Sequence, residues 1–110
     1  MPRFGLTLNL KDDPDVIEQY KTYHRNVWPE VLDSLREVGI TQMDIYLLGN
    51  RLFMAIDTVD DFDPVHDFPR HLEIHPRCRE WDVLMRNFQE RVPEAEPGEW
   101  WATMEQVFEL

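Results

Sequence analysis

The sequence is short of the residues that mark several large classes of protein. Cys78 is its only cysteine, so it can form no internal disulfide, and a reducing compartment is expected. Its four glycines are scattered, which excludes a glycine-rich phosphate-binding loop, and no Gly-x-Ser-x-Gly nucleophile elbow is present. No stretch approaches the ~20 apolar residues of a membrane span, and the first residues lack the long apolar segment of a secretory signal. We therefore expect a soluble, cytoplasmic protein.

Basic residues are also scarce. The chain has 11 Lys and Arg residues against 22 Asp and Glu residues, a formal net charge of −11. Nucleic acids and anionic membrane surfaces attract basic patches, so neither is an expected partner. What the chain does have is a globular composition, 43% hydrophobic with four tryptophans. Its 110 residues suffice for one domain, residues 1–110.

Apolar periodicity divides the first part of the chain into one strand and two helices. Alternation over residues 3–10 predicts a strand. One of the two aspartates before Pro14 can cap a helix that starts there. The inward stripe of this helix is predicted to be Val16, Ile17, Tyr20, His24 and Val27. A break before Pro29 then leads into a second helix that ends at Gly39.

The rest of the chain predicts a hairpin, a helix and a final strand. Strands are expected over residues 40–48 and 51–59, joined by a Gly-Asn turn. Residues 65–75 fit an irregular segment or a short helix. A firmer helix begins at Pro76, and after a proline-rich loop residues 100–110 predict the last strand.

The resulting β-α-β-β-α-β order is typical of the ferredoxin-like fold, an α+β protein with a four-stranded antiparallel sheet and both helices on one face. The other face of such a sheet should be polar. Both faces of the middle strands are apolar instead, with Met43, Ile45 and Leu47 on one and Ile40, Tyr46 and Leu48 on the other. A second copy of the sheet would cover the outer face, so we expect a homodimer, a dimeric α+β barrel.

A candidate site lies on the helix before the break. At 3.6 residues per turn, Tyr20 and His24 share one face of that helix. Trp81 and Asp82 lie on the later helix and should approach them, since both helices cover the same face of the sheet. An imidazole that titrates near neutrality beside an aromatic wall suits acid–base chemistry on a sugar. From spacing alone, the alternative is a core-facing helix whose histidine is simply hydrogen-bonded.

A second group of residues has the chemistry to hold a metal. His66, His71 and His75 are accompanied by acidic residues, and neutral imidazoles are common zinc or iron ligands. Against a metal site, Pro69 makes a continuous helix doubtful and no cysteine joins the set. A solvated polar loop is the favoured interpretation, and no metal is expected.

Several short motifs of this chain resemble those of the L-rhamnose mutarotase family. They are Tyr20-x-x-x-His24-x-x-x-Trp28-Pro29-Glu30, Asp44-Ile45-Tyr46, Leu52-Phe53-Met54, Trp81 and Glu105-x-Val107-Phe108. The resemblance runs over nearly the whole chain. It implies a dimeric ferredoxin-like protein that interconverts the α and β anomers of an L-sugar with no metal or cofactor. It also implies that His24 is the proton donor and that Tyr20 and Trp81 contact the sugar.

Two positions depart from the pattern of that family. Met43 stands where rhamnose mutarotases have a substrate-contacting tyrosine, and Asp82 stands where they have a second tryptophan. Both features resemble a sister branch that includes L-fucose mutarotases, so L-fucose joins L-rhamnose as an expected substrate. Opening a sugar ring needs an acid and a base but no nucleophile, and Asp82 or a water can serve as the complementary base.

Two other classes of function fit the same expected shape. A cofactor-free or haem-handling monooxygenase of the dimeric α+β type would consume oxygen or show a haem absorption band. A non-catalytic module for small ligands would bind a sugar without accelerating the exchange of its anomers.

Overall fold

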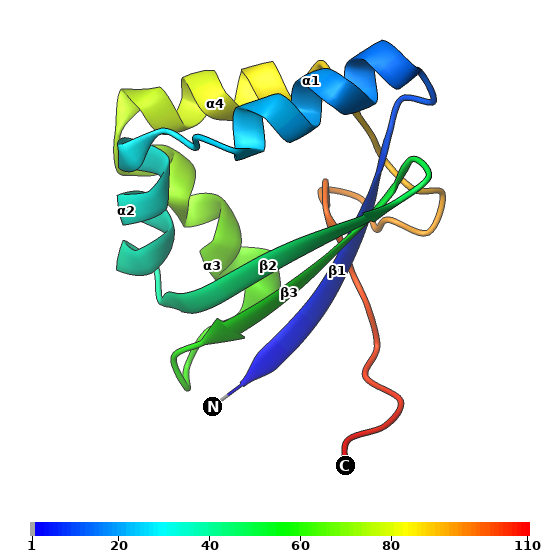
Figure 1. Ribbon diagram of the computed structural model, residues 1–110. Coiled ribbons are helices and arrows are strands. Elements are labelled where there is room, and N and C mark those ends of the chain that lie inside the picture. Colours follow the sequence, from blue (N-terminus) through cyan, green and yellow to red (C-terminus); the bar gives the residue numbers. More distant parts are fainter. Residues whose placement is uncertain (1) are drawn as a thin grey trace.

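The computed structural model describes residues 2–110, and its elements follow the predicted order (Figure 1). The strands are β1 (Arg3–Leu10), β2 (Ile40–Leu48), β3 (Arg51–Thr58), β4 (Gln89–Glu90) and β5 (Ala102–Thr103). The helices are α1 (Pro14–His24), α2 (Pro29–Glu37), α3 (Pro64–Asp67), the 3-10 helix η1 (Phe68–Glu73) and α4 (Pro76–Arg86). The antiparallel sheet has the order β2-β3-β1-β4, and β5 also pairs with β1. With the helices on one face of the sheet, the ferredoxin-like α+β prediction is confirmed.

Local signals place the first two helices. Asp13 caps α1 because its side chain accepts a hydrogen bond of 2.9 Å from a backbone N–H of the first turn. Pro29 occupies the first turn of α2, where its missing N–H removes no hydrogen bond. Trp28 takes the extended ψ of 135° that a following proline favours, so the chain leaves the first helix before that point. The helix α1 therefore ends at His24, and Val27 lies in the connection, not on the predicted helical stripe.

The hairpin of β2 and β3 turns at Gly49-Asn50 as predicted, and Gly49 has a positive φ of 62°. A register shift between Ile40 and Gln42 marks a bulge at the start of β2. An extra residue in one strand changes which side chains face the core beyond it. Ile40 is buried in the core for this reason, and its predicted place on the outer face was wrong.

The prediction of one long strand over residues 100–110 is wrong. Only Ala102–Thr103 pairs with β1, while Gln89–Glu90 occupies the other end of the same edge. The backbone N–H of Met104 still donates to the carbonyl of Gly5 at 2.8 Å, but residues 105–110 form no strand and are exposed. Apolar alternation produces a strand only where an edge and a packing surface are both available. Within one chain, the apolar side chains of this tail have no such surface.

Two apolar clusters fill the space between the sheet and the helices. One surrounds Trp81 and Met85 of α4, which pack with Leu10 and Leu52 of the sheet. The other combines strand residues with Val38 at the end of α2 and with Phe62: Leu6, Val38, Ile40, Met54, Ile56 and Phe62. None of the helices described over residues 2–110 combines the length and apolarity needed to cross a bilayer.

On the opposite face of the sheet, no helix of the described residues 2–110 covers the strands (Figure 1). Tyr46 of β2 stacks on Phe53 of β3 with ring centroids 6.3 Å apart, yet these residues are 62% and 40% exposed. Leu48, at the end of β2, is 86% exposed. The prediction that β2 and β3 are apolar on both faces is confirmed by these exposed side chains.

Candidate active site

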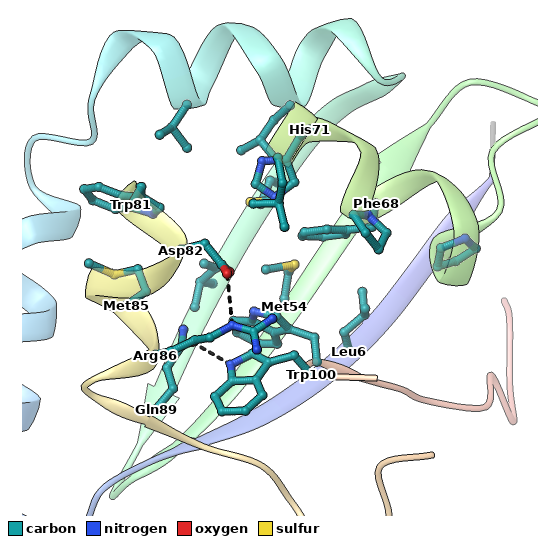
Figure 2. Close-up of a pocket in the computed structure, with 18 of the residues that line it drawn as sticks. Leu6, Met54, Phe68, His71, Trp81, Asp82, Met85, Arg86, Gln89 and Trp100 are labelled. Carbon is teal, nitrogen blue, oxygen red and sulfur yellow. Dashed lines mark hydrogen bonds and ion pairs between the residues drawn. The ribbon is translucent and has the colours of Figure 1, made fainter. Parts of the chain in front are cut away.

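A cavity of about 210 Å³ opens between the sheet and the helices (Figure 2). Side chains of all three long strands form its apolar floor: Leu6, Met43, Ile45 and Met54. Its walls come from α1, α2, α3, η1, α4 and the segment before β5. Tyr20, His24 and Trp81 all line it, so the three predicted site residues meet in one cavity. Its size suits a ligand smaller than those of drug-sized pockets, which measure roughly 300–1,000 Å³.

Tyr20 and His24 are stacked as their spacing predicts, with ring centroids 4.1 Å apart. The Nδ1–H of His24 donates to the backbone carbonyl of Tyr20 at 2.9 Å. Because a carbonyl only accepts, this bond fixes the tautomer and leaves Nε2 with its lone pair when the ring is neutral. Burial lowers the pKa of the His24 imidazole, and the bond to Tyr20 opposes part of that shift. Neutral His24 can therefore accept a proton at Nε2 and act as a base.

Tyr20 itself is almost fully buried. Burial raises the pKa of its phenol to about 12, although the side chain of Gln89 opposes the rise. The hydroxyl consequently stays protonated at neutral pH, and it can donate or accept a hydrogen bond without carrying charge. Tyr20 is placed to orient a ligand or the His24 ring, not to act as a charged base.

Trp81 forms the predicted aromatic wall opposite the Tyr20–His24 pair. Its ring stands edge-on to His24 at a centroid distance of 5.6 Å and to Trp28 at 5.0 Å. The guanidinium of Arg77 lies 3.7 Å from the centroid of the Trp28 ring on the outer side of this group. The motif at the junction of α1 and α2 thus supplies the imidazole, from His24, and part of the aromatic support for Trp81, from Trp28.

Sequence reasoning missed the polar network at the other end of the cavity (Figure 2). Asp82 pairs with Arg86 at 3.0 Å, and the Arg86 guanidinium lies 4.3 Å from the centroid of the Trp100 ring. The Nε1–H of Trp100 donates to the side-chain oxygen of Gln89 at 2.8 Å. The i, i+4 spacing of Asp82 and Arg86 was a usable signal for the ion pair. Trp100 follows a proline-rich loop, and no local pattern links it to α4.

The three histidines after the hairpin do not form a cluster. His66 on α3 is exposed and donates to Asp63 at 2.6 Å, while Nδ1 of His75 accepts the backbone N–H of Arg77 at 3.0 Å and caps α4. His71 is buried and lines the cavity, so the interpretation as a solvated loop was wrong for this residue. Over residues 2–110, no three His, Cys, Asp or Glu side chains lie close enough together to hold a metal ion.

The cavity offers groups for proton transfer and polar binding. It offers the imidazole of His24, the neutral hydroxyl of Tyr20 and the carboxylates of Asp82 and Glu99, all beside aromatic and apolar surface. Among residues 2–110, no serine or cysteine lines it. Cys78 is fully buried elsewhere, with its thiol 3.7 Å from the carbonyl of Glu30. The arrangement suits acid–base chemistry on a small ligand that has both apolar and hydroxyl-bearing surface.

Comparison with known proteins gives consistent matches. The family model described as L-rhamnose mutarotase matches residues 3–110. A UPF0734 protein of Dictyostelium discoideum is 46% identical over 97% of this chain and 88% of its own length. An L-fucose mutarotase of Xanthomonas campestris is 38% identical over 100% of this chain and 89% of its own length. The solved L-rhamnose mutarotase of Formosa agariphila superposes with a TM-score of 0.69 at 19% identity, over 100% of this chain and 99% of that one.

Proposed function

The chain belongs to the L-rhamnose mutarotase family, and from that premise we propose that it interconverts the α and β anomers of a free 6-deoxy-L-sugar. The observation that carries the proposal is His24, which lines the cavity beside Trp81 with Nδ1 bonded to the backbone and Nε2 left as the working nitrogen. The enzyme is an isomerase that uses no cofactor, because the reaction consists of proton transfers and one bond rotation.

In this mechanism, Nε2 of neutral His24 takes the proton of the anomeric hydroxyl. The bond between the anomeric carbon and the ring oxygen breaks, a carbonyl forms at the anomeric carbon, and the ring oxygen receives a proton. A water beside the Asp82–Arg86 pair supplies that proton and takes it back when the ring closes. After rotation about the next carbon–carbon bond, the hydroxyl closes on the other face of the carbonyl. Protonated His24 then acts as the proton donor to the carbonyl oxygen, and both groups regain their starting forms.

The lining of the cavity supports a deoxy sugar. Met43, Ile45 and Leu6 make the floor apolar, and such a surface suits the methyl group of a 6-deoxy sugar. The aromatic face of Trp81 suits the C–H face of the ring. L-fucose is the first substrate to test, since the full-length relative from Xanthomonas is named an L-fucose mutarotase, and L-rhamnose is the second.

We also propose that the protein works as a homodimer with two sheets packed face to face. The exposed pair Tyr46 and Phe53, with Leu48 beside them, is an apolar surface that a second copy of the sheet would cover. The exposed tail contributes Val107 and Phe108 as further apolar side chains. A cytoplasmic location is proposed from the single unpaired cysteine.

Anomer exchange in wild-type protein tests the proposed activity. Saturation-transfer NMR separates the two anomeric protons of a free sugar and measures how fast they interconvert. L-fucose and L-rhamnose should exchange faster in the presence of the protein, and D-fucose, as the mirror-image control, should not. Acceleration of neither L-sugar would contradict the proposal.

The two alternative functions give different results in simple assays. A monooxygenase would consume oxygen with an aromatic substrate or show a haem absorption band on loading with haem. A binding module would retain saturable sugar binding but leave anomer exchange at its uncatalysed rate.

A further inference from the structure

His71 stands apart from the other polar groups of the cavity. It lies on η1, the 3-10 helix between α3 and α4, where Pro69 prevents a continuous α-helix. The turn buries His71 so that it is only 8% exposed, while His66 and His75 on either side remain outside. Figure 2 shows the imidazole in the cavity wall beside Phe68, whose ring is edge-on to it at a centroid distance of 5.5 Å.

Three other polar side chains around the cavity already have protein partners. His24 is bonded to the Tyr20 carbonyl, Asp82 to Arg86, and Gln89 to Trp100. The Nδ1 of His71 is buried without a hydrogen-bond partner among residues 2–110. A buried polar atom without a partner destabilises a fold, and a leucine of similar size would avoid that penalty. Because His71 lines the cavity, a molecule bound there is placed to supply that partner.

A free sugar has more hydroxyls than His24 and Asp82 can bind. Burial lowers the pKa of His71 to about 4, so the ring is neutral at neutral pH and has one N–H donor and one acceptor nitrogen. A neutral imidazole can therefore bond a hydroxyl in either direction. A site built to bond a hydroxyl strongly rejects an analogue that lacks it, because the buried polar group is then left unpaired.

We propose that His71 is a specificity-determining residue that bonds a sugar hydroxyl away from the anomeric carbon. This inference rests on the proposed mutarotase function. His24 and Asp82 would act at the reacting atoms, from α1 and α4, while His71 would select the configuration of the sugar from η1. His71 lies outside the motifs by which this chain resembles the L-rhamnose mutarotase family.

The first test compares wild-type protein with His71→Leu and His71→Gln. Exchange NMR over a range of L-fucose concentrations gives kcat and KM separately. His71→Leu should raise KM about tenfold with little change in kcat, as for one lost hydrogen bond, and His71→Gln should recover part of the loss. His66→Leu is the matched control: the same substitution at an exposed residue should leave both constants unchanged. An unchanged KM in both His71 variants would overturn the proposal.

Monodeoxy analogues of L-fucose distinguish a contact from a structural role. Wild-type protein should lose about tenfold in kcat/KM on the analogue that lacks the bonded hydroxyl. His71→Leu should lose little more on that analogue, while it remains as sensitive as wild type to the other deletions. An equal loss on every analogue would mean that His71 only supports the fold, and would sink the inference.

A binding measurement separates this inference from the proposed function. The side-chain nitrogen NMR signals of His71 should shift as L-fucose is added to the full protein, whether or not the sugar is turned over. A shift without anomer exchange would support the His71 contact and overturn the mutarotase assignment. Exchange with unmoved His71 signals would overturn the contact alone, and the absence of both would overturn both.

Discussion

At the scale of single residues, the hydrogen bonds already made decide what each side chain can still do. His24 has used Nδ1 on the backbone, which leaves Nε2 for chemistry. Tyr20 is held protonated by burial, and Asp82 is held by Arg86. His71 differs from these residues because its Nδ1 is buried and has no hydrogen-bond partner among residues 2–110. In the proposed division of roles, His24 reacts, Tyr20 and Trp81 position the sugar, and His71 selects it.

The low pKa of His71 predicts a dependence of stability on pH. Its folded pKa of about 4 lies below the ordinary value of 6.5. The unfolded chain therefore binds a proton first as pH falls, and stability is lost between those two values. From about pH 7 to pH 5, the contribution of His71 should lower the free energy of unfolding by about 2 kcal/mol, because the unfolded chain binds the proton more tightly.

Urea unfolding of wild type and His71→Leu at each pH measures this contribution. All other titrating groups are shared, so the difference between the two proteins isolates His71. The free energy of unfolding of His71→Leu should rise relative to that of wild type as the pH is lowered. Parallel pH profiles would show that the buried imidazole does not titrate as described.

At the scale of the element, local patterns predicted what local interactions determine. The cap at Asp13, the turn at Gly49-Asn50 and the helix after Pro76 depend on neighbouring residues, and each formed as predicted. The i, i+4 spacing likewise placed Tyr20 and His24 together. These features could be predicted because they involve residues within one turn of each other.

The features that sequence did not predict depend on contacts between distant segments. The bulge at Ile40 follows from the register of β2 against β3. The bond from Trp100 to Gln89 requires the proline-rich loop to fold back onto the end of α4. The final segment has strand-like alternation, yet whether it forms a strand depends on which edge and surface it meets. His71 was misread because the 3-10 turn, and not helical periodicity, sets which side chain faces inward.

The end of α2 supplies a prediction about backbone geometry. Gly39 has a φ of 110°, and a Cβ there would lie 2.7 Å from Cγ2 of Val59. Gly39→Ala should therefore destabilise the fold by ~3 kcal/mol, through both the strained φ and the clash. Gly49→Ala is the matched control: its φ is 62°, but the space around it is open, so the loss should be ~1 kcal/mol. Denaturant unfolding measures both, and equal losses would show that the contact with Val59 is unimportant.

At the scale of the whole molecule, the chain is acidic yet has an apolar outer sheet face. A net charge of −11 favours solubility, whereas exposed Tyr46, Phe53 and Leu48 favour burial against another surface. The proposed homodimer would reconcile these two features, because it would cover the apolar face and leave the charged helices in water. The cavity lies on the helix side of the sheet, so the proposed interface would leave it within one chain.

The outer face can be tested by one charge. Tyr46→Glu adds a carboxylate at the centre of the proposed interface, where its burial would be strongly unfavourable. It should convert the dimer to a monomer at micromolar concentration in light scattering, while Tyr46→Phe, which keeps the ring, should stay dimeric. A monomeric mass for the wild-type protein at that concentration would rule out the proposed assembly.

The most direct test of the central claim is the anomer exchange rate of L-fucose with wild-type protein and with His24→Ala, measured by saturation-transfer NMR. A positioned acid–base group contributes roughly 10²–10⁴ in rate, so His24→Ala should lose most of the acceleration while circular dichroism shows an intact fold. Tyr20→Phe, which removes only a hydroxyl, should lose less. If wild type and His24→Ala both leave L-fucose and L-rhamnose at the uncatalysed rate, or if His24→Ala retains the full wild-type rate, proton transfer by His24 is contradicted.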